Sequence, residues 1–158
     1  MNRALVHSAI IFSFFCKFSF AQNPAAFVDK YFLIIASTKS VEEASRVAMS
    51  ASTKTGLDYH NNKLKAHDSY GATYSADSCK KWGEEYPCYF ARGRYDDGAY
   101  ITVEYSTPYE GFQKGFFIVI AVNGSLEDEE FKQAVKKVKK VYPKSYVKKS
   151  KVYLGCMH

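Results

Sequence analysis

Several features that would assign a function directly are missing from this sequence. It has no glycine-rich phosphate loop and no serine-centred turn of the GxSxG type. After residue 21, no apolar run approaches the roughly 18 residues that a membrane-spanning helix needs. The sequence therefore predicts neither a P-loop nucleotide hydrolase nor an α/β-type serine hydrolase, and it predicts a chain that does not span a membrane.

Acidic residues are absent from the first 28 positions, which read as a secretory signal. Arg3 precedes a short apolar run, and Ser19 and Ala21 supply small residues at positions −3 and −1 of a cleavage site. We expect residues 1–21 to be cleaved. Residues 22–158 would then form one exported domain, either periplasmic or secreted.

Cysteine is scarce, because only Cys79, Cys88 and Cys156 remain beyond the expected leader. In an oxidising compartment two of them are expected to pair. The preferred pair is Cys79–Cys88, which closes a short loop, although the sequence leaves open Cys156 as a partner of either one.

Tryptophan occurs once, at Trp82, whereas the chain has 13 tyrosines and 12 phenylalanines. Hydrophobic residues make up 47% of the chain, which argues against disorder and is enough for one domain with its own core. Tyrosine is common in half-buried strands, and it can also stack on sugars. The composition therefore predicts a β-containing domain with aromatic surface.

Two segments of the chain match each other without a gap. Residues 31–43 read YFLIIASTKSVEE, and residues 116–128 read FFIVIAVNGSLED. Each begins with an aromatic and β-branched run that is typical of a buried strand. Each continues through a polar turn to Ser40 or Ser125, followed by acidic residues, which is typical of a capped helix start.

A helix and a further strand are expected after each matching segment. The first helix should end at Gly56, a natural C-cap, and the second before Pro143. Further strands are expected at about residues 57–65 and 145–154. Two such β-α-β units predict an α+β, ferredoxin-like sandwich with both helices on one face of an antiparallel sheet.

Residues 66–115 would form an insertion between the two halves. Asp97-Gly98 is a favourable hairpin turn, and apolar and polar residues alternate after it, so we expect a β-hairpin over residues 88–105. Charged and aromatic side chains gather there as a polar or carboxylated ligand would require. The candidate ligand-binding residues are Arg92, Arg94, Tyr95, Asp96, Tyr100 and Glu104.

Other chemistry has weaker support in the sequence. His60 and His67 with nearby aspartates match no metal-binding spacing, so no metal or other cofactor is expected. Residues 132–151 contain many lysines and no acid, which indicates either a solvated face or contact with an anionic surface. The stacking motif of RNA-binding strands is absent, and no nucleic-acid partner is expected.

The two strand and capped-helix segments, at residues 32–44 and 117–128, resemble the bacterial SPOR domain. That family has a duplicated ferredoxin-like fold and binds septal peptidoglycan glycans across its sheet. The resemblance covers about residues 31–65 and 115–154, with alanine at positions 36 and 121 where the family usually has glycine. Both faces of these strands are apolar, so the sheet face opposite the helices is expected to be buried under the inserted hairpin.

Together these features favour a non-enzymatic exported module that binds a cell-wall glycan such as peptidoglycan, or another anionic polymer. An interaction or inhibitor-like protein that presents residues 88–105 to a protein partner is the alternative. A small hydrolase using Asp96 and Glu104 as an acid–base pair is the third possibility.

Overall fold

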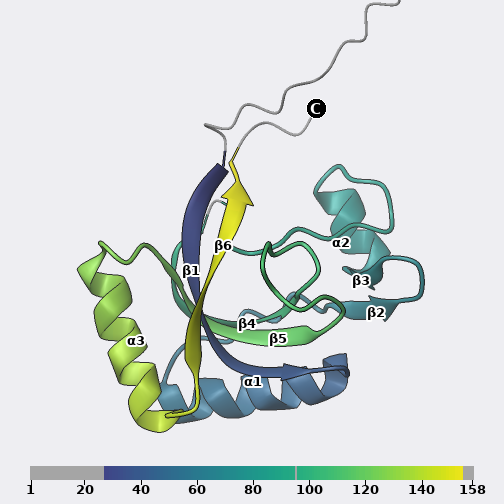
Figure 1. The fold of residues 1–158 in the computed structure, drawn as a ribbon. Helices are drawn as coiled ribbons and strands as arrows, with labels where there is room; N and C mark the ends of the chain where they lie inside the picture. Colours follow the sequence, from purple (N-terminus) through teal and green to yellow (C-terminus); the bar gives the residue numbers. More distant parts are fainter. Residues whose placement is uncertain (1–26, 95, 155–158) are drawn as a thin grey trace, which may run out of the picture.

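The structure is a computed structural model that describes residues 27–94 and 96–154 (Figure 1). The expected signal peptide, Tyr95 and Cys156 lie outside the described residues. Within the described ranges, no helix is long and apolar enough to cross a membrane.

A four-stranded antiparallel sheet forms the centre of the fold, with the strand order β4-β5-β1-β6. A separate two-stranded sheet, β2-β3, lies away from α3 (Figure 1). The strands are β1 Phe27–Thr38, β2 Lys65–His67, β3 Gly71–Thr73, β4 Gly98–Tyr105, β5 Phe117–Gly124 and β6 Tyr146–Tyr153. The first and last strands pair over their whole common length, from Phe27 opposite Tyr153 to Ile34 opposite Tyr146.

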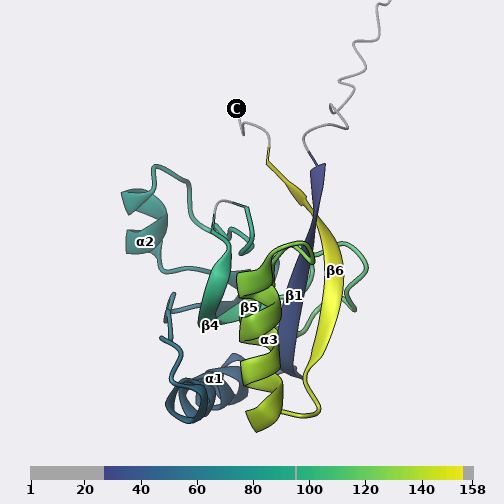
Figure 2. The same ribbon diagram turned by 90° about the vertical axis from the view of Figure 1, so that its left-hand side faces the viewer.

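Two long helices, α1 (Val41–Thr55) and α3 (Glu129–Val141), pack against each other and on the sheet (Figure 2). The start and end of α1 agree with those predicted from the sequence. The Ser40 side chain accepts a hydrogen bond from the Glu43 amide, and Gly56 adopts the left-handed conformation at φ 70°. A short third helix, α2 (Ala76–Lys81), lies beside the β2-β3 sheet.

The start of α3 differs from the prediction. Its N-cap is Asp128, whose side chain accepts from the Glu130 amide, and not Ser125. Ser125 instead begins a turn in which its carbonyl accepts from the Asp128 amide. Both residues can cap a helix, and the aspartate leaves two more acids in the first turn, where the helix dipole favours them.

The main core lies between the helices and the sheet. Apolar side chains from one face of α1 meet those of β4, β5 and β1, and Phe131 and Val138 of α3 complete the layer. Sheet residues of this core include Leu33, Ile101 and Val119, all fully buried.

A second, smaller core covers the opposite face of the sheet. Phe32, Ile34, Ile118 and Ile120 point to this side, where they pack under the loop that joins β4 to β5. Phe32 makes edge-on contacts with two rings of that loop, at 5.1 Å from Tyr109 and 6.4 Å from Phe112. The second face is covered, as expected, but the buried rings that cover it come from the β4–β5 loop and not from the expected hairpin.

The structure confirms an α+β domain with an antiparallel sheet, but it corrects two predicted elements. Residues 57–65 form no strand of the main sheet; Tyr59 makes only an isolated parallel bridge to Ile101. The predicted hairpin over residues 88–105 is also wrong, because β4 pairs with β5 and no strand precedes it in the described part of that segment. Alternation predicted β4 correctly, but its partner lies later in the chain.

Candidate functional site

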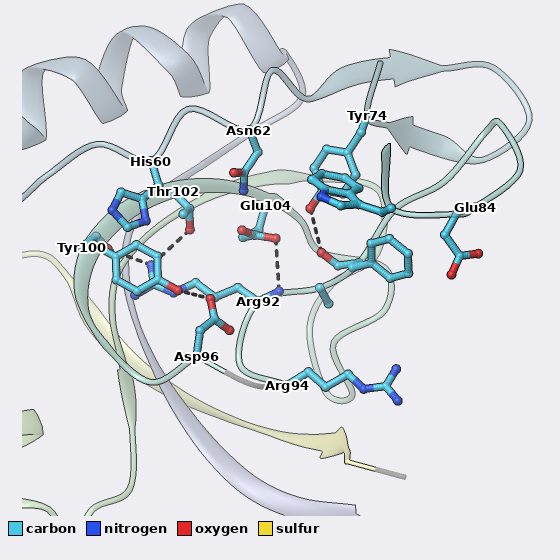
Figure 3. Close-up of a pocket in the computed structure, with 13 residues that line it drawn as sticks. His60, Asn62, Tyr74, Glu84, Arg92, Arg94, Asp96, Tyr100, Thr102 and Glu104 are labelled. Atoms are coloured by element: carbon cyan, nitrogen blue, oxygen red, sulfur yellow. Dashed lines mark hydrogen bonds between the residues drawn. The ribbon is translucent and has the colours of Figure 1, made fainter. Parts of the chain in front are cut away.

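A pocket of about 670 Å³ opens beside β4 (Figure 3). Its walls come from the loop after α1, from β4, and from residues just after β3 and α2 and before β4, namely Tyr74, Trp82, Glu84, Phe90, Ala91, Arg92, Arg94 and Asp96. Strand alternation places Tyr100, Thr102 and Glu104 on one face of β4, toward the pocket, while Ile101 and Val103 face the main core. The pocket therefore lies on the side of the sheet that faces away from α1 and α3.

Arg92 is the centre of the buried polar network at this site. Its Nε donates to the Asn123 side chain at 2.6 Å, and its two terminal nitrogens donate to the carbonyls of Tyr100, Gly98 and Ile120 and to the Thr102 hydroxyl, at 2.8–3.3 Å. β4 carries an irregularity between Ala99 and Thr102, so these carbonyls lie where the ladder to β5 is interrupted. The guanidinium therefore bridges β4 and β5 at a place where the backbone hydrogen bonds between the two strands are interrupted.

Glu104 is the second buried charge, with 1% of its surface exposed. Its Oε2 accepts from the Tyr89 hydroxyl at 2.6 Å, and from the Arg92 amide and the Tyr109 hydroxyl at 3.4 Å. Burial raises the pKa of Glu104 above its ordinary value, and the Tyr89 hydrogen bond and the Arg92 charge oppose that rise. The carboxyl is thus held in place by tyrosines from two different loops.

The Tyr100 ring stacks with the Arg92 guanidinium and with the His60 ring. The Arg92 guanidinium lies over one side of its ring, 3.4 Å from the centroid, and the His60 ring stacks on it at 4.3 Å. Its hydroxyl donates to Asp96. These contacts fix the orientation of the ring at the pocket.

Asn123 positions the turn before β4. Its side-chain nitrogen donates to the Asp96 carbonyl at 2.7 Å and to the Asp97 carboxylate at 2.9 Å, while its oxygen accepts from Arg92. The side chain is almost fully buried in a strand that is otherwise apolar. Its amide therefore couples the pocket turn to the sheet.

An aromatic wall closes the other side of the pocket. Trp82, the C-cap residue of α2, lies edge-on to Tyr74 at 5.0 Å and to Phe90 at 6.0 Å, and is 48% exposed. The predicted Cys79–Cys88 disulfide is confirmed, and it links α2 to the segment that carries Phe90. The Tyr74 hydroxyl donates to the Phe90 carbonyl at 2.8 Å and adds a second link.

The structure brings the predicted ligand-binding residues together, apart from Tyr95, which lies outside the described residues. Arg92, Arg94, Asp96, Tyr100 and Glu104 all line this one pocket. Two of them, Arg92 and Glu104, were expected to contact a ligand, but both are buried and hydrogen-bonded within the protein.

Sequence reasoning did not single out Trp82, Tyr89 or Asn123 as parts of the site. Asn123 carried a usable signal, since it is the one amide in an apolar strand. Tyr89 had none, because its role depends on contacts with β4 that are distant in sequence. His60 and Asn62 approach the pocket for the same reason: residues 58–60 hydrogen-bond to the Ile101 backbone.

Among the residues that the structure describes, no group of three or more His, Cys, Asp or Glu side chains is placed to hold a metal ion. No family model matches the chain, and no curated protein or solved structure shows significant similarity to it.

Proposed function

We propose that the protein is a non-catalytic binding module that acts outside the cytoplasm, and that the pocket beside β4 binds a sugar unit of a cell-wall glycan. The observation that carries the proposal is the exposed Trp82 ring, which lines a pocket that is also lined by hydrogen-bonding side chains. A sugar ring has apolar C–H faces and polar hydroxyl edges, so it suits a site that offers both kinds of surface.

The polar groups of the pocket suit an uncharged polar ligand. Glu84 and Asn62 are exposed at the pocket, and His60 lies beside them on the Tyr100 ring. Acceptors and donors are therefore both available to hydroxyl groups. The Arg92 guanidinium is already engaged with five oxygen atoms of the protein, so it supports the pocket floor and is not available to an anionic group.

A binding role is favoured over hydrolysis by the way Glu104 is held. A glycosidase needs one carboxyl group that can reach the glycosidic oxygen and a second across the scissile bond. Here one Glu104 oxygen accepts from Tyr89, Tyr109 and the Arg92 amide, and Asp96 accepts from Tyr100 and the Gly93 amide. Both acids serve the internal structure of the site.

Export is supported by the Cys79–Cys88 disulfide, because such bonds persist in oxidising compartments. A ferredoxin-like ancestry and a SPOR-like relationship stay part of the proposal. They are supported by the strand order, in which β1-α1-β4 and β5-α3-β6 interleave in one antiparallel sheet. Because the β4–β5 loop covers the second face of the sheet, we expect a glycan to bind in the pocket and not across the sheet.

Co-sedimentation with purified peptidoglycan across a salt series tests this function. We expect retention that survives about 0.5 M salt, at which charge attraction is screened within a few ångströms. Trp82→Ala should reduce it at least tenfold, whereas Met49→Ala, an equally exposed apolar residue on α1, should not change it. A soluble glycan oligomer should also shift the fluorescence of Trp82, which is the only tryptophan in the chain.

Two outcomes would count against glycan recognition. Retention that disappears at moderate salt and is lost in Lys136→Glu/Lys140→Glu would show only adhesion through the lysine-rich face of α3, where both residues are exposed. Retention that is indifferent to Trp82→Ala would place binding elsewhere.

The protein-partner alternative rests on Asp96 and Asp97, which are exposed at the turn before β4. It has less support, because Arg92 and Glu104 of the same segment point into the protein. Loss of a co-purifying protein in Asp96→Ala, with peptidoglycan retention intact, would favour it.

A further inference from the structure

A second pocket, of about 680 Å³, lies next to the first and has a different composition. It is bounded by the turn between β2 and β3, by residues 83–90, and by the start of the β4–β5 loop. Only Glu84 and Phe90 line both pockets. The second pocket is therefore a separate space whose chemistry can be considered by itself.

Aromatic rings from separate segments surround this space. They are Tyr70, Tyr89, Phe90 and Tyr105. Pro87 and Pro108 add rigid apolar surface. Each aromatic ring carries a negative π-face, so rings that line one space can attract a cation that occupies it.

The position of Tyr105 depends on Gly71. A Cβ atom at Gly71 would lie 2.1 Å from the Tyr105 hydroxyl oxygen, and Gly71 has φ +76°. The absence of a side chain therefore lets the Tyr105 ring reach beneath the β2-β3 turn. Tyr89 is fixed independently, through its hydroxyl on Glu104 and through the Tyr105 amide that donates to it at 2.9 Å. Two of the rings are thus held in place by the fold.

The charged residues at this pocket are all acidic. Glu84 and Glu85 line it and are exposed, whereas Lys, Arg and His are absent from the described residues that line it. The whole chain carries a formal charge of +6, so a pocket whose charged lining residues are all acidic is opposite in charge to the protein as a whole. An anionic ligand would meet two carboxylates and no countercharge.

We propose that this second pocket binds an organic cation, specifically an alkylated ammonium group. Aromatic faces attract cations through their quadrupole, and carboxylates at the mouth add long-range attraction. A methylated ammonium suits the rings better than a primary ammonium, because it is weakly hydrated and needs no hydrogen-bond acceptors deep in the pocket. This inference does not depend on glycan binding by the first pocket.

Tetramethylammonium and choline are the probes, and 3,3-dimethylbutan-1-ol is the matched control, since it is choline with carbon in place of the charged nitrogen. We expect choline to bind with a Kd of about 1 mM by NMR titration of the purified protein. The amide shifts should centre on Tyr70, Glu85 and Thr107. The alcohol should bind at least tenfold more weakly.

Variants at the mouth of the pocket locate the site without disturbing the core. Glu84→Gln/Glu85→Gln should weaken choline binding about tenfold, and Tyr70→Ala, at a side chain that is 65% exposed, about fivefold. Glu127→Gln/Glu130→Gln removes the same charge from the start of α3 and should leave choline binding unchanged. Far-ultraviolet circular dichroism should show all variants folded.

Three results would overturn the proposal. Equal binding of choline and the alcohol would mean that the pocket is only apolar. No shift at 20 mM choline would mean that it holds no cation. Stronger binding of methylguanidinium than of tetramethylammonium would point to an arginine side chain of a partner. Peptidoglycan retention that fails while choline still binds would refute the glycan proposal alone, because Tyr70 and Glu85 do not line the first pocket.

Discussion

Replacing Arg92 by methionine should be among the most damaging single changes in this protein. The substitution keeps most of the apolar stem but removes the guanidinium, which donates to five oxygens. Only 4% of the surface of Arg92 is exposed. It would leave the Tyr100, Gly98 and Ile120 carbonyls short of a donor and Glu104 without its nearby positive charge. Leaving one buried hydrogen-bonding group unsatisfied costs about 1–3 kcal/mol, so the loss of several such bonds should cost about 3–5 kcal/mol in total.

Urea unfolding of wild type, Arg92→Met and Arg92→Lys measures this cost. Arg92→Lys keeps the charge but has one nitrogen, which cannot reach oxygens spread along the two strands β4 and β5, so its stability should fall between those of the other two proteins. Arg46→Met, at an exposed arginine of α1, is the matched control and should change the free energy of unfolding by less than about 0.5 kcal/mol.

The pH dependence distinguishes a lost charge partner from a lost packing contact. Burial raises the pKa of Glu104 above its ordinary value of 4.5. The protonated acid therefore favours the folded state below that value, and this stability is lost as the pH rises through the raised pKa. Removing Arg92 raises the pKa further, so Arg92→Met should cost more at pH 7 than at pH 4.

Adding Glu104→Gln to Arg92→Met should recover about 1–3 kcal/mol at pH 7, because the uncompensated carboxylate is removed with it. The reasoning is refuted if Arg92→Met costs under 1 kcal/mol, or if the double variant is as unstable as the sum of the two single variants.

Two further predictions concern the supports of the site. Cys79→Ala/Cys88→Ala should lower the free energy of unfolding by about 2.5–3 kcal/mol, which is the loop-closure entropy that a disulfide across so short a loop removes from the unfolded chain. Reduction of the wild-type protein should have the same effect in urea unfolding, and equal stability of the reduced and oxidised protein would contradict the prediction. Phe32 faces away from α1 and α3 but is fully buried against Tyr109 and Phe112. Phe32→Ala should therefore lower the free energy of unfolding by about 3–5 kcal/mol in thermal or urea unfolding. A cost near zero would show that the second core does not contribute to stability.

Local signals in the sequence identified most of the regular elements. The run from Tyr31, the Ser40 cap and Gly56 at the end of α1 act through contacts within a few residues, so they could be recognised without knowledge of the fold. Strand β6 and the alternation in β4 were equally visible. The start of α3 was misplaced because Ser125 and Asp128 are both good caps, and only the turn between them decides which one is used.

Pairing and site assembly depend on contacts that the sequence does not display. The Asp97-Gly98 turn favoured a local hairpin, but Arg92, Gly93 and Phe90 instead line the pocket and the second face of the sheet. The clustering of Arg92, Asp96, Tyr100 and Glu104 could be predicted because they are close in sequence. Asn123 could be noticed as an amide in an apolar strand, but its contact with Arg92, 31 residues away, could not be predicted. The roles of Tyr89 and Trp82 could not be predicted either, because they depend on contacts with Glu104 and Tyr74 that the sequence does not display.

The pairing of the first and last strands affects how the chain can fold during synthesis. β1 lies between β5 and β6, and both of these neighbours belong to the last third of the chain. An emerging chain therefore exposes the apolar residues of β1 until nearly all of it has been made, and the sheet can close only afterwards. The longer the last third of the chain takes to make, the longer the apolar residues of β1 stay available for aggregation.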